Sequence, residues 1–274
     1  MRTILPAPRR LLILSLLVLV STTPSVCLGQ EASSGTLVPE AVQAQAKALQ
    51  QSILQGTKAY DIVRSLTVEV GPRPAGSPGD KAAVAWALRT LKGLGFSNVR
   101  AEKVTVPHWE RGAESGAILA PFPQPVALTA LGGSVGTPAG GLEAEVVEVP
   151  SLDALSSLDP ARTKGKIVFI NTRMKRTKDG SGYGETVPIR SRGASAAAKL
   201  GAVAVLIRSV GTDNNRTPHT GSIRYEEGVE KIPAAALSNP DADLLSYQVA
   251  SAKPVRFRLS LGARQLPDEE SVNV

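Results

Sequence analysis

Side chains that hold metal ions or act as nucleophiles are scarce in this sequence. Its 274 residues include two histidines, His108 and His219, and a single cysteine, Cys27. A protein zinc site takes most of its ligands from histidine, cysteine, aspartate and glutamate at characteristic spacings. Neither histidine has a second ligand at such a spacing. We therefore predict no metal ligand and no catalytic residue within these 274 positions.

Each histidine has a plainer interpretation beside the chemical one. His108 lies in V-P-H-W-E-R-G (106–112), where it could act as an acid or base beside Glu110. The favoured alternative is the end of a strand, with Trp109 packing inward and Arg111 paired with an acid. His219 lies among turn residues in T-P-H-T-G (217–221), which is typical of a solvated loop. Such a loop can still present a polar side chain to a binding site.

Two further motifs suggest chemistry but lack its full pattern. G-A-S-A-A (193–197) is one residue short of the G-x-S-x-G nucleophile elbow, and no strand leads into it. We interpret it as a buried helix face. D-G-S-G-Y-G-E (179–185) lacks the Lys-Ser/Thr of a phosphate-binding loop, so we predict a flexible surface loop. The carboxylates are scattered and single out no acid/base pair.

The first 29 residues have the pattern of a secretory signal peptide. Arg9 and Arg10 precede an apolar run, 11–20, that is too short to span a bilayer. Small and polar residues follow, with a cleavage position after Gly29. Acylation of Cys27 is disfavoured because Val26 is a poor neighbour for that reaction. We predict a cleaved leader, a secreted or periplasmic protein and no stable membrane anchor.

Charge argues against nucleic acid as a partner. Cleavage after position 29 removes three arginines and no acid, which lowers the formal net charge from +7 to +4. No stripe of Lys and Arg with interleaved aromatic residues is present. Cleavage also removes Cys27, the single cysteine, so we predict a domain without disulfides. Aromatic residues make up only 4% of the chain, which predicts an aliphatic core.

Periodicity and turn residues predict an α/β fold. The best-signalled helix runs over 77–94, with Ser77 as its cap and Pro78 at the first position. The runs 166–171 and 202–208 are almost wholly apolar, which is typical of central strands buried on both faces. Further helices are predicted over 38–55, 59–69, 188–200 and 239–251. Further strands are predicted over 99–107, 117–120, 126–131, 143–149, 233–237 and 255–261.

The order of these elements predicts an insertion. Helices and one strand occupy 30–112, a mixed domain occupies 113–262, and 263–274 begins a return into the first domain. The charged residues 268–270 look like a turn, and a new strand starts near Ser271 with no later segment to pair with. We therefore expect the front part of a larger enzyme.

Several motifs together resemble a known family. They are G-P-R-P-A-G-S (71–77), V-P-H-W-E-R-G (106–112), S-V-G-T-P (134–138), K-G-K-I-V (164–168), K-L-G-A-V-A-V-L-I-R-S (199–209), T-P-H-T-G (217–221) and K-I-P-A (231–234). In this order they strongly resemble the N-terminal half of the carboxypeptidase Q-like secreted zinc metallopeptidases. The resemblance covers about 37–274.

The resemblance implies an α/β zinc-exopeptidase domain interrupted by an inserted protease-associated domain at 113–262. It implies two zinc ions in the full-length protein, with all ligands beyond Val274, and short peptides as substrates. This chain alone is then expected to be inactive, and a homodimer is compatible with the resemblance. His219, Tyr183 and Arg190 are the expected contacts to substrate. The alternative is a non-catalytic secreted module that binds peptides or partner proteins.

Overall fold

The computed structural model describes residues 38–251 and 253–274, and the chain divides into two compact units, 1–57 and 58–274. The predicted signal peptide lies outside the described residues. In the first unit, helix α1 (Glu40–Gln55) has no buried residue. Its apolar positions Val42, Leu49 and Ile53 are all exposed, so no described residue covers the apolar side of this helix. No helix among the described residues is long and apolar enough to cross a bilayer.

The second unit begins with two helical segments. Helix α2 (Ala59–Ser65) continues into a π-helical turn, η1 (Leu66–Val70), and helix α3 follows (Pro78–Gly93). The predicted cap of α3 is confirmed, because Ser77 Oγ accepts a hydrogen bond from Asp80 N at 3.2 Å. Trp86 is the buried residue of α3, and its indole N–H donates to Ser65 Oγ at 2.9 Å.

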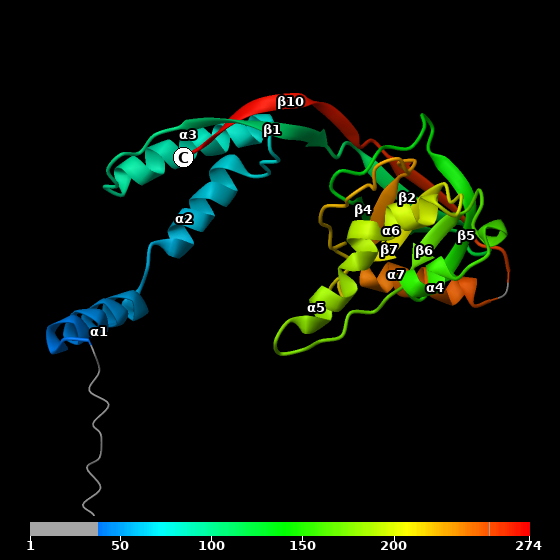
Figure 1. Ribbon diagram of the computed structural model, residues 1–274, viewed down its shortest axis with the longest axis horizontal. Helices are drawn as coiled ribbons and strands as arrows, with labels where there is room; N and C mark the ends of the chain where they lie inside the picture. Colours follow the sequence, from blue (N-terminus) through cyan, green and yellow to red (C-terminus); the bar gives the residue numbers. More distant parts are fainter. Residues whose placement is uncertain (1–37, 252) are drawn as a thin grey trace, which may run out of the picture. The chain divides into compact units, whose positions relative to one another are not determined.

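A two-stranded antiparallel ribbon follows from residues far apart in the sequence. Strand β1 (Glu102–Glu110) pairs with β10 (Arg264–Asn273), and Figure 1 shows the two running side by side. The strand predicted to start near Ser271 instead begins at Arg264, and its partner is a strand that comes earlier in the chain. The interpretation of residues 268–270 as a turn is wrong, because Glu269 and Glu270 pair with Val106 and Thr105 of β1. Their carboxylates also form solvent-exposed ion pairs with Lys81 and Lys103, at 3.3 and 3.1 Å.

The mixed domain is built on one eight-stranded sheet in the order β3-β2-β9-β5-β6-β7-β8-β4. Strands β5 to β8 are parallel, and the remaining pairs are antiparallel. The strands are β2 (Glu114–Ala120), β3 (Gln124–Val126), β4 (Leu128–Ala130), β5 (Leu142–Val149), β6 (Ile167–Ile170), β7 (Ala204–Arg208), β8 (Ala234–Leu237) and β9 (Arg256–Leu261).

The two edge strands of this sheet are consecutive in the sequence. Strands β3 and β4 are separated by Ala127 alone, yet they lie at opposite ends of the strand order. The sheet must therefore curl until its edges approach each other, in the manner of a partly closed barrel. The single strand predicted over 126–131 is wrong, because two short strands with different partners replace it.

Helices cover the sheet on both faces. They are α4 (Leu152–Ser156), a 3₁₀ turn η2 (Pro160–Arg162), α5 (Ser181–Thr186), α6 (Pro188–Ala198) and α7 (Asn239–Val249). One core cluster joins Phe169 and Leu206 to α7, and the other joins Val168 and Val205 to α6. Strands β6 and β7 are wholly buried, and α6 connects them, so the predicted strand-helix-strand unit is confirmed (Figure 1). The flexible loop predicted at 179–185 is instead mostly α5.

The ribbon and the mixed sheet are joined at a close backbone crossing. Gly112 has φ 66°, and a Cβ there would lie 2.3 Å from the carbonyl oxygen of Gly262. The amide of Gly262 in turn donates to Ala113 O at 2.8 Å. Only glycine tolerates both the conformation and the approach. The boundaries predicted at 113 and 262 fall at this crossing, but the identity of the domain between them stays a prediction.

Candidate functional site

Polar residues gather where the central parallel strands end. Asn171 follows β6, Arg208 ends β7, and Asn239 begins α7 directly after β8. Because these strands are parallel, their carboxyl ends lie at one edge of the sheet. Ligands of open α/β sheets bind in crevices outside this edge. We call residues 171–180, 208–222 and the start of α7 the carboxyl edge.

Arg208 organises the carboxyl edge. Its side chain is buried, and the residue is only 2% exposed. Its guanidinium donates to Asn171 Oδ1 at 2.6 Å, to the carbonyl of Asn239 at 3.2 Å and to the carboxylate of Asp243. Burial lowers the pKa of Arg208, although the hydrogen bond to Asp243 opposes this effect. A buried guanidinium with three acceptors of this kind ties the end of β7 to the segment after β6 and to the first turns of α7.

Asp243 is shared by two arginines. It accepts hydrogen bonds from Arg208 and from the exposed Arg173. Burial alone would raise the pKa of Asp243, but its hydrogen bonds with Arg208 and Arg173 outweigh that effect and hold the pKa below its ordinary value. The carboxylate therefore stays ionised at neutral pH and leaves one positive charge of the pair of arginines uncompensated.

A cleft of about 350 Å³ opens at this cluster. Its charged and amide-bearing lining is contributed by Arg173, Arg176, Arg208, Asp213, Asn214, Asn239 and Asp243. Sequence reasoning missed this cluster. The available signal was the run of polar residues directly after each buried strand, which general α/β architecture places together.

The three residues expected to contact substrate come close to the same edge. Arg190 Nη2 donates to Tyr183 OH at 2.9 Å, and its guanidinium lies over the tyrosine ring at 5.6 Å. Gly221 packs on this guanidinium so closely that a Cβ would lie 2.5 Å from Arg190 Cζ. His219 is exposed in the same loop, with its amide donating to Ser209 Oγ at 2.7 Å. The structure thus joins Tyr183 and Arg190 beneath the loop of His219, and their contact with substrate stays a prediction.

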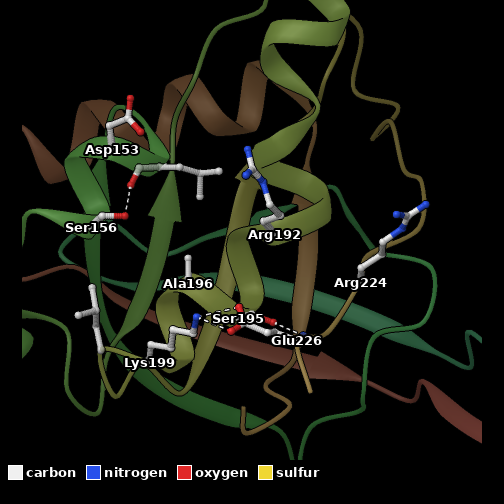
Figure 2. Close-up of a pocket in the computed structure, with 10 residues that line it drawn as sticks. Asp153, Ser156, Arg192, Ser195, Ala196, Lys199, Arg224 and Glu226 are labelled. Carbon is white, nitrogen blue, oxygen red and sulfur yellow. Dashed lines mark hydrogen bonds and ion pairs between the residues drawn. The ribbon is translucent and has the colours of Figure 1, made fainter. Parts of the chain in front are cut away.

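A second hollow, of about 420 Å³, lies between α4 and α6 (Figure 2). Figure 2 shows Lys199 and Glu226 facing each other beside Ser195, and both carboxylate oxygens lie 2.7 Å from Lys199 Nζ. Ser195 is buried within α6, and its Oγ accepts a hydrogen bond from Glu226 N at 2.9 Å. The interpretation of this motif as a helix face is confirmed, since a nucleophile elbow would expose the serine at a turn.

His108 is 8% exposed within β1, as the strand interpretation predicted. Its Nε2 lies 3.9 Å from Glu110 Oε1 and has no hydrogen-bond partner among the described residues. The expected pairing of Arg111 with an acid is wrong. Arg111 instead donates to Thr129 Oγ1 at 3.0 Å and lies over Trp109 at 5.0 Å, because the neighbouring strand offers neutral acceptors.

The described residues do not fit a zinc site. Within 38–251 and 253–274, no group of three or more histidine, cysteine, aspartate or glutamate residues is placed to hold a metal ion. Zinc sites in proteins use at least three such ligands. We therefore derive no metal-dependent step from these residues.

Comparison with known proteins places the chain in a family. No protein-family model matches the sequence. Over 216 residues, 79% of this chain, it is 39% identical to carboxypeptidase Q of Mus musculus, 38% to that of Homo sapiens and 40% to that of Xenopus laevis. The chain belongs to the carboxypeptidase Q-like family of M28 peptidases. It spans 44–45% of the length of these relatives, and the family resemblance seen in the sequence motifs is confirmed.

Solved structures confirm the fold class. An M28 peptidase precursor from Shewanella amazonensis is 51% identical, with a TM-score of 0.81 over 84% of this chain and 52% of that chain. A zinc aminopeptidase from Bacillus subtilis shares the fold at 21% identity, with a TM-score of 0.53 over 78% of this chain and 45% of that chain. The mixed α/β architecture of this carboxypeptidase Q-like chain is therefore that of M28 peptidases.

Proposed function

We propose that this carboxypeptidase Q-like chain is the N-terminal portion of a secreted zinc-dependent exopeptidase that hydrolyses short peptides. The observation that carries the proposal is the likeness to the Shewanella amazonensis M28 peptidase precursor, at 51% identity over most of the chain. The 38–40% identity to carboxypeptidase Q of several vertebrates supports the exopeptidase class.

The zinc dependence is proposed from proteins similar to this chain. A protein of the same fold is named a zinc aminopeptidase. Following the family resemblance, we assign the two zinc ions of the proposed enzyme to residues outside these 274 positions. The chain alone is then inactive. Zinc bound in the longer protein would polarise the scissile carbonyl and activate water.

The mixed domain at 113–262 is proposed as an inserted protease-associated domain that forms a wall of the substrate cleft. Its own buried core supports a rigid body that can limit access. Tyr183, Arg190 and His219 are proposed as its substrate contacts, since the Tyr183–Arg190 pair and the exposed His219 share one edge. A rigid wall of this kind would favour short peptides over folded proteins.

The decisive experiment compares hydrolysis of dipeptides, with added zinc, by this chain and by a longer version that spans the full length of its relatives. We expect turnover and stoichiometric zinc in the longer protein and neither in the 274-residue chain. Turnover of a peptide bond, or tight stoichiometric zinc uptake, by the 274-residue chain alone would contradict the assignment.

The second candidate is a non-catalytic secreted module that binds peptides or partner proteins. The self-contained core of the mixed sheet favours it. The coding sequence directly after codon 274 separates the two candidates. An in-frame continuation that encodes histidine and aspartate ligands supports the peptidase, and a native stop codon supports the module.

Secretion is proposed from the leader pattern alone. Mass spectrometry of the protein recovered from an expressing culture should find a mature N-terminus at Gln30. An intact N-terminus at Met1 in material from outside the cell would contradict a cleaved leader.

A further inference from the structure

We propose that the cleft at the carboxyl edge binds a small oxyanion, either a phosphate or the carboxylate of a small amide-bearing molecule. The residues that line the cleft carry this inference, which does not depend on the proposed peptidase activity. The cleft volume, about 350 Å³, is within the range of small-ligand sites.

Charge is the first argument. Three guanidinium groups line the cleft, from Arg173, Arg176 and Arg208, against two carboxylates, from Asp213 and Asp243. Asp243 is shared between Arg173 and Arg208, whereas Arg176 donates to the neutral hydroxyl of Thr212 at 3.3 Å. Asp213 disfavours an anion, but the cleft retains an excess of positive charge.

Preorganisation is the second argument. Arg208 is fixed by hydrogen bonds to Asn171, Asn239 and Asp243, so it also holds the carboxylate of Asp243 in place. Arg173 is tethered to the same carboxylate while its side chain remains 66% exposed. A tethered, exposed guanidinium can contact a ligand without losing much further conformational freedom. Planar N–H forks match the oxygens of carboxylates and phosphates.

Asn239 supplies an independent third observation. The residue is 7% exposed and lines the cleft. Its amide nitrogen donates to the carbonyls of Asp213 at 2.9 Å and Gly211 at 3.3 Å, which fixes the orientation of the amide. Its buried Oδ1 is then an acceptor without a donor among the described residues. Such acceptors are uncommon in folded proteins. The Oδ1 is shielded from solvent, so the Asn239 amide must turn toward the cleft before a bound group that carries an N–H or O–H beside its negative charge can satisfy it.

The hollow of Figure 2 offers a matched control. Arg192 lines it, is exposed, and lies on α6 away from the carboxyl-edge cleft. Its loss removes a positive charge from the chain while leaving the proposed site intact. A specific site can therefore be separated from the general attraction of a basic protein for anions.

The test is calorimetric titration of the full chain in a buffer without other oxyanions. The probes are inorganic phosphate, N-acetylglycine and, as the uncharged counterpart, N-acetylglycinamide. The proteins are the wild type, the double variant Arg173→Gln/Arg176→Gln, and the control Arg192→Gln. Both substituted arginines of the double variant are exposed, and Arg208 still keeps Asp243, so we expect an unchanged melting temperature.

We expect one of the two oxyanions to bind at a single site, with the affinity lowered about tenfold or more in the double variant and unchanged in the control. Preference for phosphate or for N-acetylglycine identifies the source of the oxyanion. Absence of binding by both, equal binding of N-acetylglycinamide, or an equal loss in Arg192→Gln would each overturn the proposal.

Discussion

At the residue scale, Asp243 is the carboxylate that two arginines of the carboxyl edge share. It compensates Arg208, which is buried, and Arg173, which is exposed. Removing one member of a buried pair leaves the other as an uncompensated charge, which is why such losses are costly even where the intact pair contributes little. Asp243 is itself 44% exposed, so water screens part of this effect.

We predict that Asp243→Asn lowers the free energy of unfolding at pH 7 by about 2 kcal/mol, because Arg208 loses its carboxylate. Urea unfolding measures this change. Glu227→Gln, which removes an exposed carboxylate on a loop, is the matched control and should change stability by less than about 0.5 kcal/mol.

The same residue predicts a pH dependence. The pKa of Asp243 is lower in the folded state than its ordinary value, so the folded state favours the ionised form. The contribution of Asp243 to the free energy of unfolding is complete above the ordinary aspartate pKa of about 3.9. It is lost as the pH falls through the pKa that Asp243 has in the folded state. The difference in unfolding free energy between the wild type and Asp243→Asn should therefore shrink below about pH 4. A difference that stays constant from about pH 7 to about pH 3 would contradict this assignment.

At the element scale, the crossing of Gly112 and Gly262 links the β1–β10 ribbon to the mixed sheet. Both chain passages between the two structures use this point, since β1 leads to β2 and β9 leads to β10. The backbones approach so closely that a side chain at position 112 has no space. The crossing therefore depends on residue type rather than on hydrophobic packing.

We predict that Gly112→Ala destabilises the chain by about 3 kcal/mol, because it combines an unfavourable positive φ with a clash against the carbonyl of Gly262. Gly140→Ala is the control. Gly140 has φ 88°, but a Cβ added there would meet no atom within 4 Å, so backbone strain of about 1 kcal/mol is expected. Thermal melts compare the two, and equal effects would show that the crossing imposes no steric demand.

At the scale of the whole molecule, burial is unevenly distributed. The mixed domain has two clusters of buried apolar residues, one on each face of its sheet. By contrast, α1 and α2 have no buried residue, and Tyr60, Val63 and Val68 are exposed within the second unit. Segments with few buried apolar contacts open more easily than a packed core.

Limited proteolysis should therefore cut the chain within 38–112 before it cuts within 113–262. Mass spectrometry of the fragments over time would locate the cuts, and a persistent fragment close to 113–262 is the expected result. Equal resistance across 38–274 would show that the N-terminal helices are as well protected as the mixed domain.

The sequence by itself determined the features that depend on residues close together in the chain, namely buried strands, a helix start and family motifs. The continuous apolar runs identified β6 and β7 as buried strands, Ser77 and Pro78 marked the start of α3, and ordered motifs indicated the peptidase family. Only the tertiary structure decided which distant segments pair. It joined β10 to β1, separated β3 from β4, and brought Arg208 and Asp243 to one edge. The physical reason is that periodicity reports burial along one segment, whereas strand partners and charge clusters are chosen between segments.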